Sequence, residues 1–86
     1  MLIEIYTKPT CPYCYRAKQL LSKKNLDFTE YDLIDRPELR DEMIKRSAGL
    51  STVPQIFIND NYLSDCDGLH FFEQNGTLDS IIEKNK

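Results

Sequence analysis

The sequence predicts an α/β fold in which helices flank a four-stranded mixed β-sheet, with the element order βαβαββαα. Residues 2–6 and 28–33 alternate between apolar and polar side chains, and residues 55–58 are largely apolar, as in strands. Apolar residues at helical spacing follow each of the first two strand segments. Asn25 and Gly76 mark the points at which helical segments are expected to end. This order of elements is typical of one sheet covered by helices.

The first half of the chain reads as a strand, a helix and a second strand. The first strand is expected at residues 2–6, and the helix from Pro12 or Tyr13 to about Lys24. Residues 28–33 form the next strand. Because a helix separates these strands, we expect them to be parallel and joined by a right-handed crossover.

A second helix is expected after the segment Asp35-Arg36-Pro37-Glu38. The acid at position 35 and the glutamate three residues later form the pattern of a capping box. The helix should end near residues 47–49, and its apolar stripe consists of Leu39, Met43 and Ile44.

The second half of the chain predicts a hairpin followed by two helices. The third strand, residues 55–58, is followed by turn residues 59–61, and a short fourth strand begins at Tyr62-Leu63. Ser64 or Asp65 should cap a third helix that continues to about Phe72. A last short helix should begin at Thr77, with its inward face formed by Leu78, Ile81 and Ile82.

Length and composition predict one domain, residues 1–86, with a true hydrophobic core. The 86 residues are 41% hydrophobic and 29% charged. The sequence has no long apolar run and no secretion signal, so we expect the chain neither to insert into a membrane nor to be exported. Three cysteines are too few, and odd in number, for a disulfide-framed secreted domain. We therefore expect a reducing, cytoplasmic location.

The net charge of −3 makes the chain a poor candidate for binding nucleic acids, because it has no patch of basic and aromatic residues. The charge is nevertheless uneven. Within residues 1–25, Glu4 is the only acid, whereas the bases are Lys8, Arg16, Lys18, Lys23 and Lys24. A cationic field at this end would favour a thiolate and an anionic partner, although the same charges could simply be a solvated helix face.

Cys11 and Cys14 lie where the first strand passes to the first helix, which favours thiol chemistry. If Cys11 is the N-cap, Pro12 occupies the first helical position, where its missing N–H has no cost. The free N–H groups of Tyr13 and Cys14 then point at the Cys11 sulfur. The helix dipole and the nearby Lys8 add positive potential. These effects predict that Cys11 is a nucleophilic thiolate.

Cys14 is placed to resolve the product of an attack by Cys11. It lies three residues later on the same helical face, within disulfide reach, and deeper in the helix. We therefore expect Cys11 to attack a disulfide and Cys14 to release it. The alternative without redox chemistry is a static disulfide or two inert thiols, but a disulfide that closes so short a loop adds little stability.

A zinc site is a second alternative. Cys11, Cys14, Cys66 and His70 have the ligand types and local spacings of one. The two halves are far apart in sequence, however, and the first lies at a strand-to-helix junction instead of a tight turn containing glycine. We therefore expect no metal.

Across essentially its whole length the sequence resembles the glutaredoxins, especially the small bacterial dithiol type. The residues that carry the resemblance are I-Y-T-K-P-T-C-P-Y-C at 5–14, M-I-K-R-S at 43–47, T-V-P-Q-I-F at 52–57 and C-D at 66–67. The C-P-Y-C tetrapeptide and the later T-V-P together are a specific signal, whereas C-x-x-C alone is common to many thioredoxin-like proteins.

The resemblance implies a thioredoxin-like fold and glutathione-dependent reduction of protein disulfides and glutathione mixed disulfides. It implies a cis peptide between Val53 and Pro54, which would aim the Val53 backbone at a substrate. The positions matching the family's glutathione contacts are Lys8, Tyr13, Thr52, Val53, Pro54, Cys66 and Asp67. Lys8 would meet the glycyl carboxylate and Tyr13 would flank the sulfur.

The same resemblance bears on cofactors and partners. We expect glutathione as a co-substrate and no tightly bound cofactor. Disulfide-containing proteins are the expected substrates, with ribonucleotide reductase among the candidates that the family suggests. The expected state is a monomer.

One segment departs from the family pattern. Glutaredoxins commonly have Gly-Gly-Cys-Asp-Asp before the third helix, whereas this chain has Ser64-Asp65-Cys66-Asp67-Gly68. The N–H groups of Cys66 and Asp67 would receive the γ-glutamyl carboxylate of glutathione. Asp65 could cap those donors or repel that carboxylate, and Gly68 lacks an acid for the ligand's ammonium group. This departure predicts weaker glutathione binding.

Two rival functions remain open from the sequence. One is a thioredoxin-like electron donor that serves a single protein and depends less on glutathione. The other is an iron–sulfur cluster carrier in which Cys11 of two subunits and two glutathiones hold the cluster. Pro12 and Cys14 disfavour the carrier, because sites with one thiol beside a small residue are the usual cluster binders.

Overall fold

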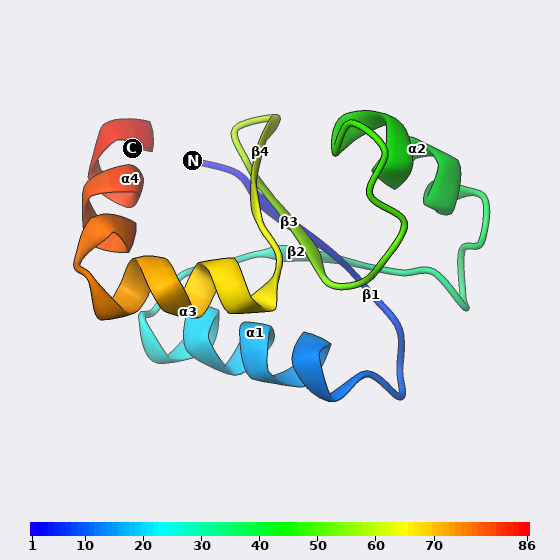
Figure 1. Cartoon of the computed structure of the whole chain (residues 1–86), viewed down its shortest axis with the longest axis horizontal. Coiled ribbons are helices and arrows are strands. Elements are labelled where there is room, and N and C mark those ends of the chain that lie inside the picture. The colour runs from blue at the N-terminus through cyan, green and yellow to red at the C-terminus, as the bar shows by residue number, and fades with distance from the viewer.

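The computed structural model describes residues 1–86 and contains a four-stranded sheet with four helices (Figure 1). In chain order the elements are β1 (Ile3–Thr7), α1 (Pro12–Lys23), β2 (Thr29–Asp32), α2 (Leu39–Arg46), β3 (Gln55–Ile58), β4 (Asn61–Ser64), α3 (Cys66–Gln74) and α4 (Thr77–Asn85). The strand order is β2-β1-β3-β4. β1 is parallel to β2 and antiparallel to β3, which pairs antiparallel with β4. The predicted mixed sheet and element order are confirmed.

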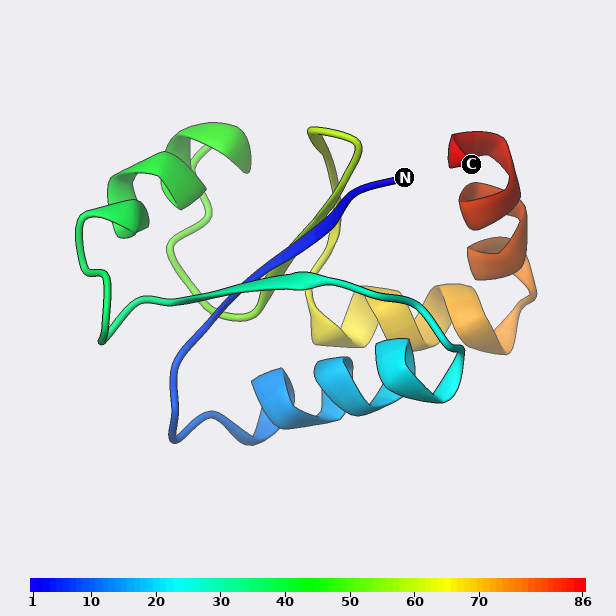
Figure 2. The same cartoon turned by 180° about the vertical axis from the view of Figure 1, so that it is seen from behind.

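The two faces of the sheet carry different layers. α1 and α3 lie side by side on one face, and α2 covers the other (Figures 1 and 2). Because successive side chains of β1 point to opposite faces, Ile3 and Ile5 join the core under α1 and α3. Tyr6 instead packs with Met43 of α2 in a smaller cluster. None of the four helices has the length and apolar character that a membrane span requires.

The hairpin and the last two helices follow the prediction closely. Asn59 and Asp60 both have positive φ, 48° and 69°, and form the two-residue turn between β3 and β4. Asp65 is the N-cap of α3, which extends two residues beyond the expected Phe72 to Gln74. On α4, the buried residues are Leu78 and Ile82.

The predicted capping box at Asp35 is wrong. The N-cap of α2 is Glu38, which makes no side-chain capping bond. The Asp32 carboxylate at the end of β2 accepts hydrogen bonds from the N–H groups of Ile34 and Asp35, at 2.8 and 3.2 Å. Asp35 is therefore part of a turn. Since a residue before proline avoids the helical region, the helix begins only after Pro37.

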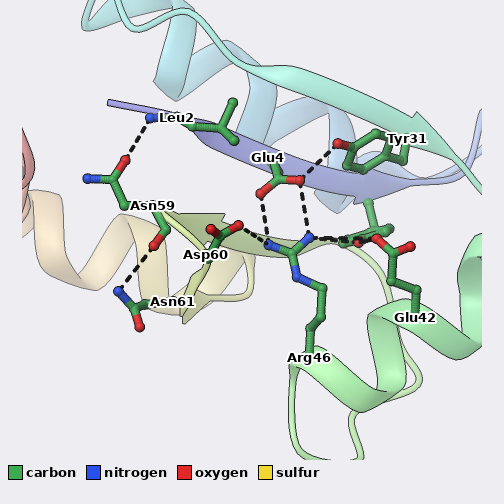
Figure 3. Close-up of polar contacts among 9 residues, drawn as sticks. Leu2, Glu4, Tyr31, Glu42, Arg46, Asn59, Asp60 and Asn61 are labelled. Carbon is green, nitrogen blue, oxygen red and sulfur yellow. Dashed lines mark hydrogen bonds and ion pairs between the residues drawn. The ribbon is translucent and has the colours of Figure 1, made fainter.

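Arg46, which the sequence did not single out, fastens α2 to the sheet (Figure 3). Its guanidinium donates two hydrogen bonds to the Glu4 carboxylate, at 2.8 and 3.2 Å, and one to the Tyr6 hydroxyl at 2.8 Å. Tyr31 donates a further bond to Glu4 at 2.8 Å. The guanidinium carbon lies 4.2 Å from the centre of the Phe57 ring. Glu4 is only 6% exposed, and the hydrogen bond from Arg46 lowers its pKa despite this burial.

We expect Glu4→Gln to lower the free energy of unfolding by about 3 kcal/mol, because it removes the buried carboxylate that contacts the Arg46 guanidinium most closely. The acids that remain, Glu42 and Asp60, lie 3.9 and 3.7 Å from Arg46 and are more exposed. Urea denaturation would measure the change. Glu38→Gln is the matched control, since Glu38 pairs with Arg36 on the exposed surface. That control should change stability little.

The lowered pKa of Glu4 also predicts a pH dependence. Its contribution is fully present above the unfolded glutamate pKa of about 4.3 and is lost as the pH falls through the lower folded pKa. Stability should therefore fall less steeply with acid in Glu4→Gln than in the wild type. If the free energy of unfolding falls equally steeply with decreasing pH in both proteins, the pair of Glu4 and Arg46 does not stabilise the fold.

Candidate redox site

Cys11 is the N-cap of α1, as predicted, and its extended backbone (φ −110°, ψ 105°) turns the chain from β1 into the helix. The Cys14 N–H donates to the Cys11 sulfur at 3.1 Å. The second bond expected, from Tyr13 N–H, does not form, because an N-cap side chain here lies over the third helical residue. Pro12 occupies the first helical position. Cys11 is partly exposed and therefore open to a substrate.

The loop between α2 and β3 lies beside the Cys11 sulfur. The Val53–Pro54 peptide is cis, as the resemblance implied. The carbonyl of Val53 lies 3.8 Å from Cys11 Sγ and accepts a weak hydrogen bond from the thiol. Cys11 therefore lies between an N–H donor of α1 and the backbone of the cis-proline loop.

Cys14 differs sharply from Cys11. Its side chain is 1% exposed, and both cysteines are free thiols in the structure. Burial raises the pKa of Cys14, and the hydrogen bond with Cys11 raises it further. Cys14 thus stays protonated at neutral pH. An exposed first cysteine beside a buried second one is the asymmetry that attack followed by resolution requires.

Three separate segments meet beside Cys11 to form a shallow cleft of about 110 Å³. Its lining consists of Tyr13, Thr52, Val53, Pro54, Asp65, Cys66 and Asp67. The structure thus brings together six of the seven residues that matched glutathione contacts. The seventh, Lys8, is exposed between β1 and α1 and does not line the cleft. A wider hollow of about 1060 Å³ runs along α1, but no cysteine lines it.

At the start of α3, one of the free backbone N–H groups already has a side-chain acceptor. The Asp65 carboxylate accepts a hydrogen bond from the Gly68 N–H at 2.8 Å, which identifies Asp65, not Ser64, as the cap. The hydroxyl of Ser64 is buried and has no hydrogen-bond partner. A Cβ added at Gly68 would lie 2.8 Å from the Ser64 Cβ and 3.2 Å from Asp65 Oδ1. A side chain at position 68 would therefore require Ser64 to shift.

Cys66 lines the cleft but is 3% exposed, and burial raises its pKa. Its sulfur lies 3.6 Å from Nδ1 of His70. No group of three or more His, Cys, Asp or Glu side chains is arranged to hold a metal ion. The contact between Cys66 and His70 is therefore a pairing within one turn of α3.

Comparisons with known proteins agree with one another. The family described as glutaredoxin matches residues 3–63. Glutaredoxin 3 of Escherichia coli K12 is 49% identical over 81 residues, which cover 94% of this chain and 96% of that protein. The solution structure of a glutaredoxin from Brucella melitensis has a TM-score of 0.83 at 46% identity, covering 100% of this chain and 92% of that one. A buckwheat glutaredoxin–glutathione complex shares the fold, with a TM-score of 0.85 at 20% identity over 95% of this chain and 76% of its own.

Proposed function

This chain belongs to the glutaredoxin family and is a thiol–disulfide oxidoreductase, and on that premise we propose that it draws its electrons from glutathione. The observation that carries the proposal is the position of Cys11. The residue is partly exposed, and its sulfur is hydrogen-bonded at the N-terminus of α1. It adjoins the cleft that the cis-proline loop and the start of α3 complete.

The first step with a glutathione mixed disulfide is attack by the Cys11 thiolate on the sulfur of the glutathione moiety. The bond between Cys11 and glutathione forms as the bond between glutathione and the protein breaks, and the protein leaves as a thiolate that takes up a proton. A second glutathione thiolate then attacks the glutathione sulfur of this adduct. Glutathione disulfide leaves, and Cys11 returns to its thiolate form with no net change in the enzyme.

A protein disulfide needs both cysteines. Cys11 attacks one sulfur and the other leaves as a thiolate, so that the substrate is tethered to Cys11. The Cys14 thiol gives up its proton as its sulfur attacks the Cys11 sulfur, and the substrate sulfur bound to Cys11 leaves as a thiolate that takes up a proton. A disulfide between Cys11 and Cys14 remains. Two glutathiones reduce that disulfide in turn. The burial of Cys14 keeps it out of the first step without separating it from Cys11.

The cleft supports a ligand in an extended conformation. Thr52 and Val53 take part in no backbone–backbone hydrogen bond, so the Val53 N–H is open to pair with a peptide-like ligand as an added strand would. Tyr13 is 54% exposed and can cover the ligand's sulfur. Lys8 would reach the glycyl carboxylate from outside the cleft. The glutathione in the buckwheat relative's complex lends support to this ligand.

We propose further that Asp65 lowers the affinity of the cleft for glutathione. Its carboxylate already accepts a hydrogen bond from the N-terminus of α3 and places a negative charge where the γ-glutamyl carboxylate would bind. Asp65→Gly should lower the KM for a glutathione mixed disulfide about tenfold, as loss of one close like-charge contact allows. Glycine is a tolerated N-cap, so the helix should persist. Steady-state kinetics with glutathione and glutathione reductase would measure the change.

Two further variants make the Asp65 experiment discriminating. Asp65→Asn keeps a capping oxygen and removes the charge. If it lowers the KM as Asp65→Gly does, the cause is repulsion between the Asp65 carboxylate and the γ-glutamyl carboxylate. Asp35→Asn removes one charge from an exposed turn and should leave the KM unchanged. A full return to the common family pattern requires Ser64→Gly together with Asp65→Gly and Gly68→Asp, because of the short Cβ contact at position 64. An unaltered KM in both Asp65 variants would refute the proposed weakening.

The Asp65 cap also favours a second candidate function. If the cap keeps glutathione binding weak, the chain would serve better as a dithiol electron donor to one protein substrate. Full activity toward a protein disulfide with little activity toward small mixed disulfides would support this alternative. For either function we propose a monomer in the cytoplasm, with no tightly bound cofactor.

A further inference from the structure

Gln55 is a buried polar residue directly behind the cis-proline loop. It begins β3, is 1% exposed, and does not line the cleft. Its amide nitrogen donates to the carbonyl oxygen of Thr52 at 3.0 Å and to the Thr52 hydroxyl at 3.2 Å. Its amide oxygen accepts a hydrogen bond from the Tyr62 hydroxyl at 2.8 Å. Both ends of the buried amide are therefore satisfied, and each points to a different segment.

Tyr62 anchors the far end of this arrangement on the edge strand β4. Its ring meets the edge of Phe57 at 5.5 Å between centroids. Burial raises the pKa of Tyr62, so its hydroxyl keeps the proton that it donates to Gln55. The hydrogen bonds thus run from β4 through Gln55 to Thr52. They connect the rigid hairpin to a loop outside the sheet.

The loop has almost no other polar support. Residues 51–54 make no backbone–backbone hydrogen bond. The bonds that fix Thr52 come from Gln55, and the only hydrogen bond at Val53 is the weak one that its carbonyl accepts from Cys11. The Val53 side chain packs against the smaller core cluster under α2. Among the polar contacts, those through Gln55 and Thr52 are the ones that can orient the Val53 peptide group.

We propose that Gln55 is a positioning residue for the reaction of Cys11. By holding both oxygens of Thr52, it fixes the orientation of the Val53 peptide group beside Cys11 and keeps the Val53 N–H open to the substrate. Gln55 itself touches neither the substrate nor the reacting sulfur. This inference rests on the proposed function, because it assigns a task to the strand-like pairing at Val53. It concerns substrate binding more than the chemical step.

Gln55→Met tests the role with a side chain of similar length that cannot hydrogen-bond to Thr52. The KM for a glutathione mixed disulfide should rise about tenfold, because loss of preorganisation by a fraction of an ångström has effects of this size. The kcat should change less than the KM. Tyr62→Phe, which removes only the distal bond, should raise the KM by a smaller factor and covers the case in which Gln55→Met fails to fold.

Tyr31→Phe is the matched control. Tyr31 lies on the opposite edge strand β2 and donates its hydroxyl to Glu4, also at 2.8 Å, so the same atom is lost from a hydrogen bond that does not involve the loop. A purely structural role predicts that Tyr31→Phe and Tyr62→Phe alter stability and kinetics alike. Positioning predicts that only Tyr62→Phe raises the KM.

A readout independent of activity comes from the backbone amide NMR signals of Thr52 and Val53. In Gln55→Met these signals should shift or broaden, while signals of α2 stay in place. An unchanged KM with unchanged loop signals in folded Gln55→Met would overturn the proposal, as would an equal rise in KM for Tyr31→Phe. If the wild type does not turn over the mixed disulfide, the glutathione proposal fails, and the loop signals alone decide the role of Gln55.

Discussion

Cys11→Ser is expected to abolish disulfide reduction, with rates falling at least about a thousandfold, as removal of an enzyme's nucleophile does. Each proposed pathway begins with the Cys11 thiolate, and neither Cys14 nor Cys66 can replace it. Both are buried, 1% and 3% exposed, and burial raises the pKa of each thiol. The measurement is the rate of reduction of a glutathione mixed disulfide and of a protein disulfide by the same preparation.

The fold should survive this substitution, so a loss of activity can be assigned to the missing sulfur. Serine is among the preferred N-cap residues, and its hydroxyl can accept the bond that the Cys14 N–H now gives to Cys11. A melting temperature close to that of the wild type would establish the control. Substantial activity in Cys11→Ser would mean that another thiol begins the reaction.

Cys14→Ser is expected to separate the two activities. Reduction of glutathione mixed disulfides should persist, because external glutathione resolves the adduct on Cys11. Reduction of a protein disulfide should fall by about two orders of magnitude or more, since an intramolecular thiol held in place has a large effective concentration. Parallel assays with the two substrates would measure how far each rate falls in Cys14→Ser relative to the wild type.

The contrary result is equally clear for Cys14. If Cys14→Ser lost both activities in a folded protein, Cys14 would be needed to activate Cys11 and not only to resolve the adduct. If it kept both, glutathione alone would resolve every intermediate. Either outcome would reject the division of labour between the two cysteines.

The parts of this molecule that local patterns control could be predicted from the sequence. Pro12 after Cys11 marks the start of a helix, and Asp65 is a good N-cap wherever a helix follows it. Alternation of apolar residues indicated the strands, although the structure places β1 one residue later and makes β2 shorter than expected. The cis bond before Pro54 followed from the family resemblance and not from the residues themselves.

The remaining features depend on contacts between distant segments. The pairing of Glu4 with Arg46 joins β1 to α2, and neither residue has a neighbour in sequence that reveals it. Gln55 resembles any polar residue at a strand start until Tyr62 and Thr52 are brought to it. In such cases a side chain's partner is set by how helices, loops and strands pack together, which local sequence does not encode.

The prediction of a capping box failed for a different, local reason. Its pattern was present, but Asp32 and Pro37 imposed a turn first. A local signal was thus overridden by two others within five residues of it.

Treatment of Cys14→Ser with glutathione disulfide tests the central claim most directly. The account predicts one glutathione per chain by intact mass, located on Cys11 by peptide mapping and removed by added glutathione. Because Cys14 is absent, the adduct cannot be resolved internally and should accumulate. An adduct on Cys66, or no adduct while Cys11 still reacts with a small alkylating agent, would contradict a glutathione-dependent reaction at Cys11.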